Sequence, residues 1–410
     1  MAKKNAISGK IEIEISGVKY TATVEFKEAP KAEAKETPKY KAWGVRIDRT
    51  VKDPEKAVEY IGDAQGYEPA RGANPGSWDN HPVFNKIKPC LLKEGKVAVY
   101  LNPNDYCYTE GGSSVDELRD FFDTMVEFSK LYYRIHQDER YTYAEVTDDP
   151  ASLADGFTDY AYSYKGKVRD KFYIGAYKGV IKDEKLRSVF GELPTGNKTI
   201  GEFRKAAQAN GTGYEILPFN KLTLLQVLYL IRYKSLDSRA ALGKGVTESN
   251  EYKATGGADT DGLYSGSQDG TKQIKCHGIE DFYGNLLEWV DGFVSNNKIA
   301  IADGNFNDKG DGYEAVADLP ETVYGGVITD VHGNNKLGFT PKTTDDDMCA
   351  GEGYYCNYGS TWTDDTVGLP DFGGDRSDGA LAGAFDFYCS DSASGAYSSV
   401  GARLCFCGKE

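Results

Sequence analysis

The sequence lacks an apolar run long enough to cross a bilayer. The longest, Leu222 to Ile231, spans about ten residues, whereas a membrane-spanning helix needs roughly 20. A run of about ten apolar residues is instead typical of a helix buried in the core of a globular protein. The first residues, Met1 to Asn5, lead into alternating polar sequence without the apolar core of a secretory signal. We therefore expect neither membrane insertion nor export by a signal peptide.

Positive charge is also scarce. The chain has 48 Lys and Arg residues against 63 Asp and Glu residues, which gives a formal net charge of −15. Binding to the phosphates of a nucleic acid needs clustered basic side chains. We therefore expect no nucleic-acid partner.

Metal-binding motifs are sparse as well. The four histidines are scattered, and no two of the eight cysteines form a Cys-x-x-Cys unit, so a zinc site is not expected. Without a secretory signal the cysteines are expected to remain thiols. Cys405 and Cys407, two residues apart on an expected strand, would share one face of it.

One acidic segment resembles a calcium loop, but only in part. Glu314 falls at position twelve of an EF-hand order that starts at Asp303, while position six, which needs Gly, holds Asp308. Two interpretations stay open: a structural calcium loop of another type, and a solvated loop rich in Asp and Asn, which is favoured. The weak metal candidates are Asp303, Asn305, Asn307 and Glu314.

The chain divides into three parts. Residues 1–27 contain two alternating apolar and polar runs around Ser16 and Gly17, which predict a β-hairpin for assembly or attachment. Residues 28–39, rich in Pro, Ala, Lys and Glu, are typical of an extended linker. Residues 40–410 are predicted to form one globular domain.

Within that domain the apolar spacing predicts several elements. Beyond about residue 240, Gly, Asp, Asn and Ser dominate, so the loops there need a rigid neighbouring core. The expected strands are 41–48, 96–102 and 171–180, and the expected helices are 115–130, 199–210 and 222–234.

Two blocks carry a family resemblance. Residues 277–292, HGIEDFYGNLLEWVDG, resemble the G-I-x-D-x-x-G-N-x-x-E-W motif of the formylglycine-generating-enzyme superfamily. Residues 372–406 resemble its closing pattern, a Gly-Gly turn, a loop of small residues and a final Gly-x-Arg-Leu strand. The resemblance implies an α+β, loop-rich, C-type-lectin-like fold, here preceded by the N-terminal β-hairpin.

Within that superfamily, the stretch from Trp43 onward is similar to the variable proteins of diversity-generating retroelements in phages and prophages. The segments WGVRID, LNPNDY, YIGAYKG and FGG…DGALAGAF…GARL occur there in this order. This implies a hypervariable ligand-binding or receptor-binding protein. Its role would be like that of the major tropism determinant, a phage tail-tip protein that sets host tropism.

A codon argument agrees with this resemblance. Adenine-directed mutagenesis of Asn-type codons never yields Lys, Glu, Gln, Met or Trp. None of these five occurs between Asp375 and Leu404, although Lys and Glu are common elsewhere. We therefore expect the variable ligand-binding region at about residues 350–405.

Residues of that region are predicted to have two roles. Small residues and buried anchors form a framework, in which Arg403 is expected to close a buried salt bridge. The other side chains face a ligand, in a mixture of aromatic and small polar groups typical of binding surfaces. The predicted ligand-binding residues are Asp375, Arg376, Ser377, Asp378, Asp386, Phe387, Tyr388, Ser390, Asp391, Ala396, Tyr397, Ser398, Tyr355 and Asn357.

No catalytic residue is predicted. The oxidising enzymes that this superfamily includes hold copper between two loop cysteines, and a soft copper site needs both thiolates. Here Cys389 has Ser394 where the second would fall. His277 with Glu280, Asp281 and Glu288 could suggest hydrolysis, but a structural role in a turn is favoured. We expect no cofactor, apart from the structural calcium left open above.

The leading hypothesis is therefore a host-recognition protein in the virion tail, made in the bacterial cytoplasm. Its expected partners are a host cell-surface protein or glycan and other tail proteins. A homo-oligomer is expected because several weak sites add avidity, and the resemblance suggests a trimer. The alternatives are a cellular variable adhesin and a formylglycine-generating-enzyme-like oxidoreductase.

Overall fold

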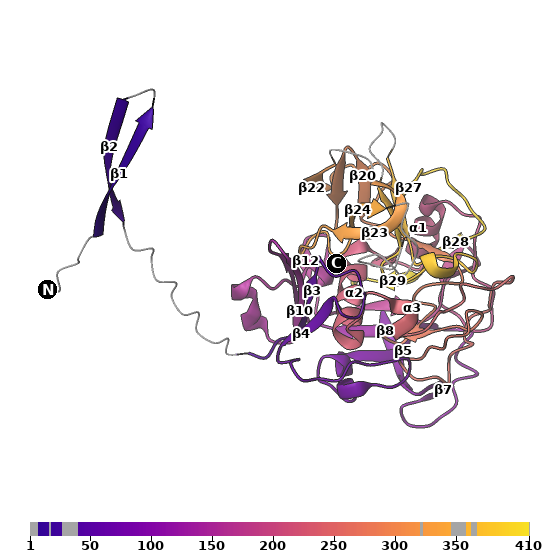
Figure 1. Ribbon diagram of the computed structural model, residues 1–410. Helices are drawn as coiled ribbons and strands as arrows, with labels where there is room; N and C mark the ends of the chain where they lie inside the picture. Colours follow the sequence, from indigo (N-terminus) through magenta and orange to yellow (C-terminus); the bar gives the residue numbers. More distant parts are fainter. Residues whose placement is uncertain are drawn as a thin grey trace. The chain divides into compact units, whose positions relative to one another are not determined.

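The computed structural model describes residues 7–15, 18–26, 40–319, 323–345, 358–361 and 367–409. The chain forms two compact units, Met1–Lys39 and Tyr40–Glu410. In the first unit β1 (Ile7–Ile15) and β2 (Val18–Phe26) pair antiparallel, with Ile7 opposite Phe26 (Figure 1). The strand pairing that the alternating apolar pattern predicts for this part of the chain is thereby confirmed.

The second unit is built mainly from sheets. A seven-stranded sheet has the order β16-β29-β13-β8-β5-β6-β7, and a four-stranded sheet has the order β4-β3-β10-β9. The bounds in the larger sheet are β16 Tyr214–Ile216, β29 Leu404–Phe406, β13 Lys171–Gly175, β8 Asp123–Ser129, β5 Ile87–Lys93, β6 Lys96–Asn102 and β7 Asp105–Thr109. Those in the smaller sheet are β4 Val58–Gly62, β3 Trp43–Asp48, β10 Tyr141–Thr147 and β9 Tyr132–Gln137.

The C-terminal part of the chain contributes most of a further seven-stranded sheet, in the order β24-β23-β25-β27-β26-β19-β28. Its strands are β24 Pro341–Asp345, β23 Val323–Val331, β25 Tyr358–Thr361, β27 Phe387–Asp391, β26 Leu369–Phe372, β19 Leu287–Trp289 and β28 Val400–Gly401. A three-stranded sheet contains β20 Phe293–Asn296, β21 Lys298–Ile301 and β22 Glu314–Asp318. Two-stranded ladders join β11 Ser163–Tyr164 to β12 Lys167–Val168, β14 Val180–Lys182 to β15 Lys185–Arg187, and β17 Lys275–Cys276 to β18 Ile279–Glu280.

The helices are few. They are α1 (Ile200–Gln208), α2 (Phe219–Tyr233) and α3 (Ser238–Ala241), with single 3-10 turns at Gly76–Trp78, Phe84–Lys86, Pro150–Asp155, Tyr160–Tyr162 and Gly379–Leu381. Thr199 begins α1 with a capping box, its side chain accepting from the Glu202 amide while the Glu202 carboxylate accepts from the Thr199 amide. Every residue of α2 is buried, so this helix is the centre of the core (Figure 1). Two of the three helices expected from the sequence, 199–210 and 222–234, are thereby confirmed.

The α+β, C-type-lectin-like class expected from the resemblance is wrong. Strands make up 36% of the chain and helices 13%, so the fold is β-rich, with many small sheets. The physical reason lies in the Gly- and Asp-rich sequence after residue 240. Frequent turns there cut most of the backbone into strands of two to five residues, with β23 the one longer strand described, and such strands are too short to show a clear period of two.

The helix expected over residues 115–130 is also wrong. Turns occupy residues 116–122, followed by β8, which lies between β13 and β5 in the sheet. Six of the seven residues of β8 are buried, because side chains cover both faces of a central strand. The resulting apolar run resembles the spacing of a helix. Leu118 and Phe121, which would have lain on the buried face of that helix, are 37% and 63% exposed.

A buried ion cluster joins the C-terminal strands to the rest of the core. Arg403 is 1% exposed, and its Nη2 and Nε lie 2.6 and 3.0 Å from Oε1 of Glu288. The same oxygen accepts from Lys178 Nζ at 2.7 Å. The remaining guanidinium hydrogens donate to the carbonyls of Gly175, Glu280 and Asp281. The buried salt bridge predicted for Arg403 is confirmed.

This cluster keeps its charge because its geometry offsets burial. Burial alone would raise the pKa of Glu288, but Arg403 and Lys178 hold that pKa below its ordinary value. A planar guanidinium can satisfy one carboxylate and three carbonyls at once, which Lys cannot. The strand ends around Glu288 and Arg403 are therefore locked together.

We predict that Glu288→Gln lowers the free energy of unfolding by about 3–5 kcal/mol, because it leaves Arg403 and Lys178 buried beside each other without an anion. Urea denaturation followed by circular dichroism measures the change. Glu192→Gln is the control, because it removes a carboxylate from an exposed pair with Lys182 and is expected to have no measurable effect. Equal midpoints for the two variants would contradict the prediction.

Candidate functional site

A pocket of about 550 Å³ opens over the C-terminal strands. Leu287 of β19 and Val400 of β28 are paired neighbours at one side, and Asp371 of β26 lies opposite Tyr388 of β27. Two loops, 373–386 and 392–399, complete the wall. The described residues that line the pocket are Leu287, Asp371, Asp378, Leu381, Asp386, Tyr388, Asp391, Tyr397, Ser399 and Val400.

The first loop is held by buried backbone contacts. The Ala384 carbonyl accepts from Gln226 of α2 at 3.0 Å, and the Ala384 amide donates to the Ser238 hydroxyl at 3.0 Å. Gly374 turns the chain with φ +77°, and a Cβ there would lie 2.4 Å from the Cβ of Ala382. No side chain fits at that position, so Gly374 is required where the loop leaves β26.

The second loop is tied by its backbone rather than by its side chains. The Tyr397 carbonyl accepts from the Asn197 amide at 2.8 Å, and the Ser399 carbonyl accepts from the Leu287 amide at 2.9 Å. These bonds do not depend on which side chains the loop carries. The Tyr397 ring is therefore presented from a fixed backbone.

Two carboxyl groups form the floor of the pocket. Asp371 is 1% exposed, and its carboxyl forms a hydrogen bond with that of Asp391, which also accepts from the Tyr397 hydroxyl. A hydrogen bond between two carboxyl groups requires a proton on one of them. Burial and the neighbouring Asp391 and Asp386 accordingly raise the pKa of Asp371 well above its ordinary value. Its Oδ1 atom has no hydrogen-bond partner among the described residues.

Two further aspartates flank this floor. Asp386 is 5% exposed, and burial together with Asp378 raises its pKa well above the ordinary value. Burial also raises the pKa of Asp378, although its Oδ2 accepts from the Asp375 amide at 2.6 Å. None of the described lining residues carries a positive charge. The pocket is therefore acidic, with protons retained by burial and like-charge repulsion.

The structure brings only some of the predicted ligand-binding residues to this pocket. Those that line it are Asp378, Asp386, Tyr388, Asp391 and Tyr397. Ser377, Ala396 and Ser398 are exposed on the same two loops, and Ser390 is half-buried on β27. Tyr355 and Asn357 lie outside the described residues.

Three predicted ligand-facing residues are used by the fold instead. Phe387 is 2% exposed and packs against Phe219 and Phe293, whereas its neighbour Tyr388 on the same strand lines the pocket, because adjacent side chains on a strand point to opposite faces. The Asp375 carboxylate accepts from the amide and hydroxyl of Ser377 and so closes a turn. Arg376 donates to the Ser249 carbonyl at 3.1 Å and lies over the Tyr252 ring. The expected outward display is therefore wrong for Phe387, and for Asp375 and Arg376 the ligand-binding role stays a prediction.

The sequence analysis did not predict five of the lining residues, which are Asp371, Leu287, Leu381, Ser399 and Val400. A signal for Asp371 was present. It stands between Pro370 and Phe372 in an otherwise apolar strand, and an acidic residue in a buried strand needs either a partner or a function. The distant Leu287 could not be found, because only the β19–β28 pairing brings it to the C-terminal segment.

The weak calcium candidates do not converge. The Asp303 carboxylate accepts from the Ser163 hydroxyl and the Gly166 amide, and Glu314 pairs with Lys336. The Asn307 side chain closes its own turn by accepting from the amides at 309 and 311 and donating to the carbonyls at 305 and 311. Within the part of the chain that the structure describes, no group of three His, Cys, Asp or Glu residues could hold a metal ion.

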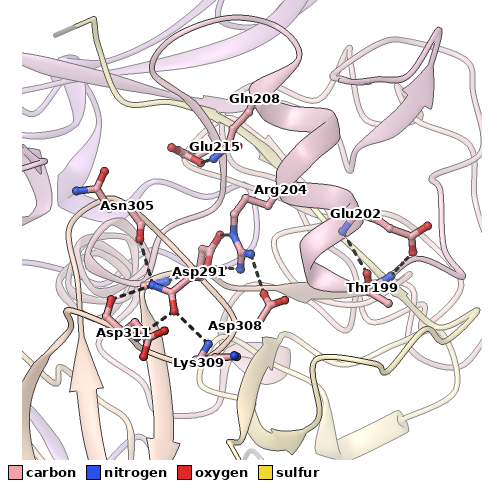
Figure 2. Close-up of polar contacts among 12 residues, drawn as sticks. Thr199, Glu202, Arg204, Gln208, Glu215, Asp291, Asn305, Asp308, Lys309 and Asp311 are labelled. Atoms are coloured by element: carbon pink, nitrogen blue, oxygen red, sulfur yellow. Dashed lines mark hydrogen bonds and ion pairs between the residues drawn. The ribbon is translucent and has the colours of Figure 1, made fainter.

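An ion pair fixes that loop to α1. Arg204 Nε lies 2.7 Å from Asp291 Oδ2, and its Nη1 lies 2.7 Å from Asp308 Oδ1 (Figure 2). Asp308 occupies the position where an EF-hand needs glycine, and here it serves as an Arg partner. The solvated, Asx-rich interpretation of the loop therefore fits these contacts.

The His277 group has structural partners. The His277 ring is fully buried between the Tyr264 hydroxyl and the Leu225 carbonyl, and burial lowers its pKa to about 3. The Glu280 carboxylate accepts from the amides of Gly256 and Ala258. Asn285 Oδ1 accepts from the Lys253 amide at 2.9 Å. The structural role predicted for these residues in a turn is confirmed.

The loop cysteine is buried. Cys389 is 0% exposed on β27, its thiol lies 3.4 Å from the Gly368 carbonyl, and burial raises its pKa well above the ordinary value. Reactive cysteines need an exposed thiolate, which this site disfavours. Cys405 and Cys407 share a buried face, with their sulfur atoms 3.7 Å apart, as their spacing predicted.

Comparisons with known proteins give little further guidance. No family model matches the chain. No curated protein matches it either. Four chains of solved structures do match, among them one titled "Major Tropism Determinant P3c Variant". That chain is 10% identical, with a TM-score of 0.28 over 99% of this chain and 82% of the other. A score of this size does not establish a shared fold. Among the described helices, none is both long and apolar enough to cross a membrane.

We predict that the acidic floor makes stability depend on pH. The raised pKa of Asp371 means that the native state binds more protons than the unfolded state above pH 3.8, so unfolding becomes easier as pH rises toward the raised pKa. Asp371→Asn removes this contribution and should flatten the fall in unfolding free energy between pH 5 and 8 by up to about 1.4 kcal/mol per pH unit. Urea denaturation at each pH measures the slope.

Asp391, Asp386, Asp378, Cys389 and Tyr397 face the same carboxyl and titrate in both proteins. The control is therefore Asp170→Asn, which removes a 98% exposed carboxylate paired with Lys130 and should keep the wild-type slope. Parallel slopes for wild type and Asp371→Asn would refute the prediction.

Proposed function

We propose that this chain is a non-enzymatic recognition protein that binds its ligand at the C-terminal pocket. The observation that carries the proposal is the construction of the pocket. Its frame consists of strand pairing, the Arg403–Glu288 cluster and backbone bonds to Asn197, Gln226 and Ser238. Side chains such as Tyr397 then project from a backbone that does not need them.

The volume and the mixed lining also suit a ligand. About 550 Å³ falls within the range of roughly 300–1,000 Å³ that is typical of small-ligand pockets. An aromatic ring at the mouth, in Tyr397, gives rigid contact area at a low entropic cost. Ser377, Ala396 and Ser398 are exposed on the two loops and would extend the surface that a larger partner contacts.

The enzyme alternative has less support. The thiol that an oxidoreductase of this superfamily would use, Cys389, is buried with a raised pKa. Of the carboxylates in the His277 turn, Glu280 accepts from backbone amides, and Glu288 is paired with Arg403 and Lys178. Neither group offers an activated nucleophile or base next to the pocket.

The finer proposal is a phage or prophage tail protein that recognises the host surface and is diversified by a retroelement. It rests on the sequence resemblance and on the five residue types missing between Asp375 and Leu404. The hairpin of β1 and β2 is proposed to attach the protein to other tail proteins or to assemble its oligomer, since an isolated hairpin is marginally stable. A trimer would raise avidity, and light scattering of the full-length protein measures the number of chains.

The genomic prediction is a template repeat nearly identical to the DNA that encodes residues of about 350–405. It should differ from the coding copy at adenines and lie beside a gene for a reverse transcriptase. Sequencing of the locus tests this. Flanking tail genes would favour the phage protein over a cellular adhesin, and a locus without any repeat would overturn diversification by a retroelement.

The binding prediction concerns Tyr397. Tyr397→Ala should weaken binding to cells of the bacterium that the phage infects by about tenfold or more, as expected when a central aromatic contact is lost. The control is Tyr108→Ala, because Tyr108 is 44% exposed against 43% for Tyr397 and lies on β7, at the opposite end of the unit from β27 (Figure 1). Flow cytometry with labelled full-length protein measures binding, and equal binding by both variants would exclude the pocket as the site.

A further inference from the structure

The pocket holds several carboxyl groups and no counter-charge. Asp371, Asp378, Asp386 and Asp391 line it, and no Lys, Arg or His stands among the described lining residues. Elsewhere in the protein, some buried carboxylates have cations, as Asp291 has Arg204, and others are satisfied by neutral donors, as Glu280 is by the amides of Gly256 and Ala258. The pocket differs in that four aspartates line one open space without a cation among the described lining residues.

One atom in the floor lacks a partner altogether. Asp371 Oδ1 is buried and accepts no hydrogen bond from the described residues, although the other Asp371 oxygen is engaged by Asp391. A buried acceptor without a donor destabilises a protein, so such an atom at the bottom of a pocket indicates that a donor is to be supplied from outside.

The two most exposed lining side chains are apolar and aromatic, and the carboxyl groups lie deeper. Leu381 is 38% exposed and Tyr397 is 43% exposed, whereas Asp371 is 1%, Asp386 is 5% and the apolar Val400 is 1% exposed. A ligand that enters therefore passes apolar and aromatic surface before it meets the carboxyl groups. The complementary shape is an apolar stem that ends in a cationic hydrogen-bond donor.

We propose that the pocket binds the side chain of a Lys or Arg residue on the surface of a receptor protein. This inference rests on the proposed recognition function and names the chemistry of its ligand. The methylene stem would lie against Leu381 and the Tyr397 ring, and the ammonium or guanidinium would donate to Asp371 Oδ1 and to Asp391. A net charge of −15 would also draw basic surfaces toward the protein.

Other cations and neutral ligands fit less well. A metal ion needs three or more ligands at short range, which the described acidic residues do not provide. A sugar carries hydroxyl groups around its ring and would leave some of them against Leu287, Leu381 and Val400. An amino sugar shares the ammonium group but not the apolar stem, so it serves as a discriminating probe.

Binding is coupled to a proton. Asp371 and Asp391 share one, and Asp386, Asp378, Cys389 and Tyr397 also face the Asp371 carboxyl. A bound cation favours the ionised carboxyl groups, so it releases the shared proton. Affinity for a cationic ligand therefore rises between pH 5 and pH 8, while affinity for a neutral ligand stays constant.

The test is isothermal titration calorimetry of the full-length protein with four probes: the Nα-acetyl methylamides of lysine, arginine and norleucine, and glucosamine. Norleucine has an apolar stem like that of lysine but no charge. We expect dissociation constants on the order of 1 mM for the lysine or arginine probe, at least tenfold weaker binding for norleucine and glucosamine, and tighter binding at pH 8 than at pH 5. Norleucine binding equal to lysine, or glucosamine binding tighter than both, would overturn the inference.

Two kinds of variant locate the site. Asp371→Asn and Asp391→Asn each remove one carboxylate and should weaken lysine binding at least tenfold, while Asp170→Asn leaves it unchanged. Leu381→Lys places a tethered ammonium at the exposed mouth and should weaken lysine binding more than Leu381→Gln does, because the Gln variant loses only the apolar contact with the stem. Because Leu381 is at the rim, this pair tests the inference even where an Asp371 variant fails to fold. Unchanged binding in Leu381→Lys would overturn it.

Cell binding separates this inference from the proposed function. If the lysine and arginine probes fail to bind while Tyr397→Ala still abolishes attachment to host cells, the pocket is a receptor site for another chemistry and only the inference fails. If Tyr397→Ala attaches like the wild type, the proposed function itself fails, whatever the probes do.

Discussion

The contact between Glu288 and Arg403 is the constraint on which the C-terminal half of the fold depends. One carboxylate receives the guanidinium and the Lys178 ammonium, and the same guanidinium satisfies carbonyls at Gly175, Glu280 and Asp281. A buried charge without such partners would be expelled or neutralised. The cluster therefore holds the strand ends in a single arrangement.

The candidate pocket inherits this rigidity. Leu287 and Val400 lie next to Glu288 and close to Arg403 in sequence, so their pairing is set by the same cluster. Asp371 of β26 pairs with Trp289 of β19, which is fully buried in the core. Tyr388 faces Asp371 from β27. A carboxyl group that no cation neutralises can persist here because the frame around it is stable without it.

This arrangement separates stability from recognition. Ion pairs that hold the fold, such as Arg204 with Asp291, have both partners inside the chain. The pocket instead keeps its acidic side chains protonated or hydrogen-bonded to one another, at some expense of stability. Functional sites often retain such locally unfavourable groups, because a ligand can supply what the fold does not.

The sequence by itself determined the N-terminal strand pairing, the two longer helices, the buried role of Arg403 and the C-terminal location of the loops that line the pocket. Each depends on local periodicity or on a charged residue in an apolar setting, which neighbours in sequence suffice to specify. Only the tertiary structure decided the β-rich class, the strand at residues 123–129 and the inward orientation of Phe387. The tertiary structure alone also brings Leu287, Asp371 and Tyr397 together around one cavity. The pairing of a short strand, and which of its faces is buried, depend on partner strands far away in the sequence. No local sequence pattern specifies those partners.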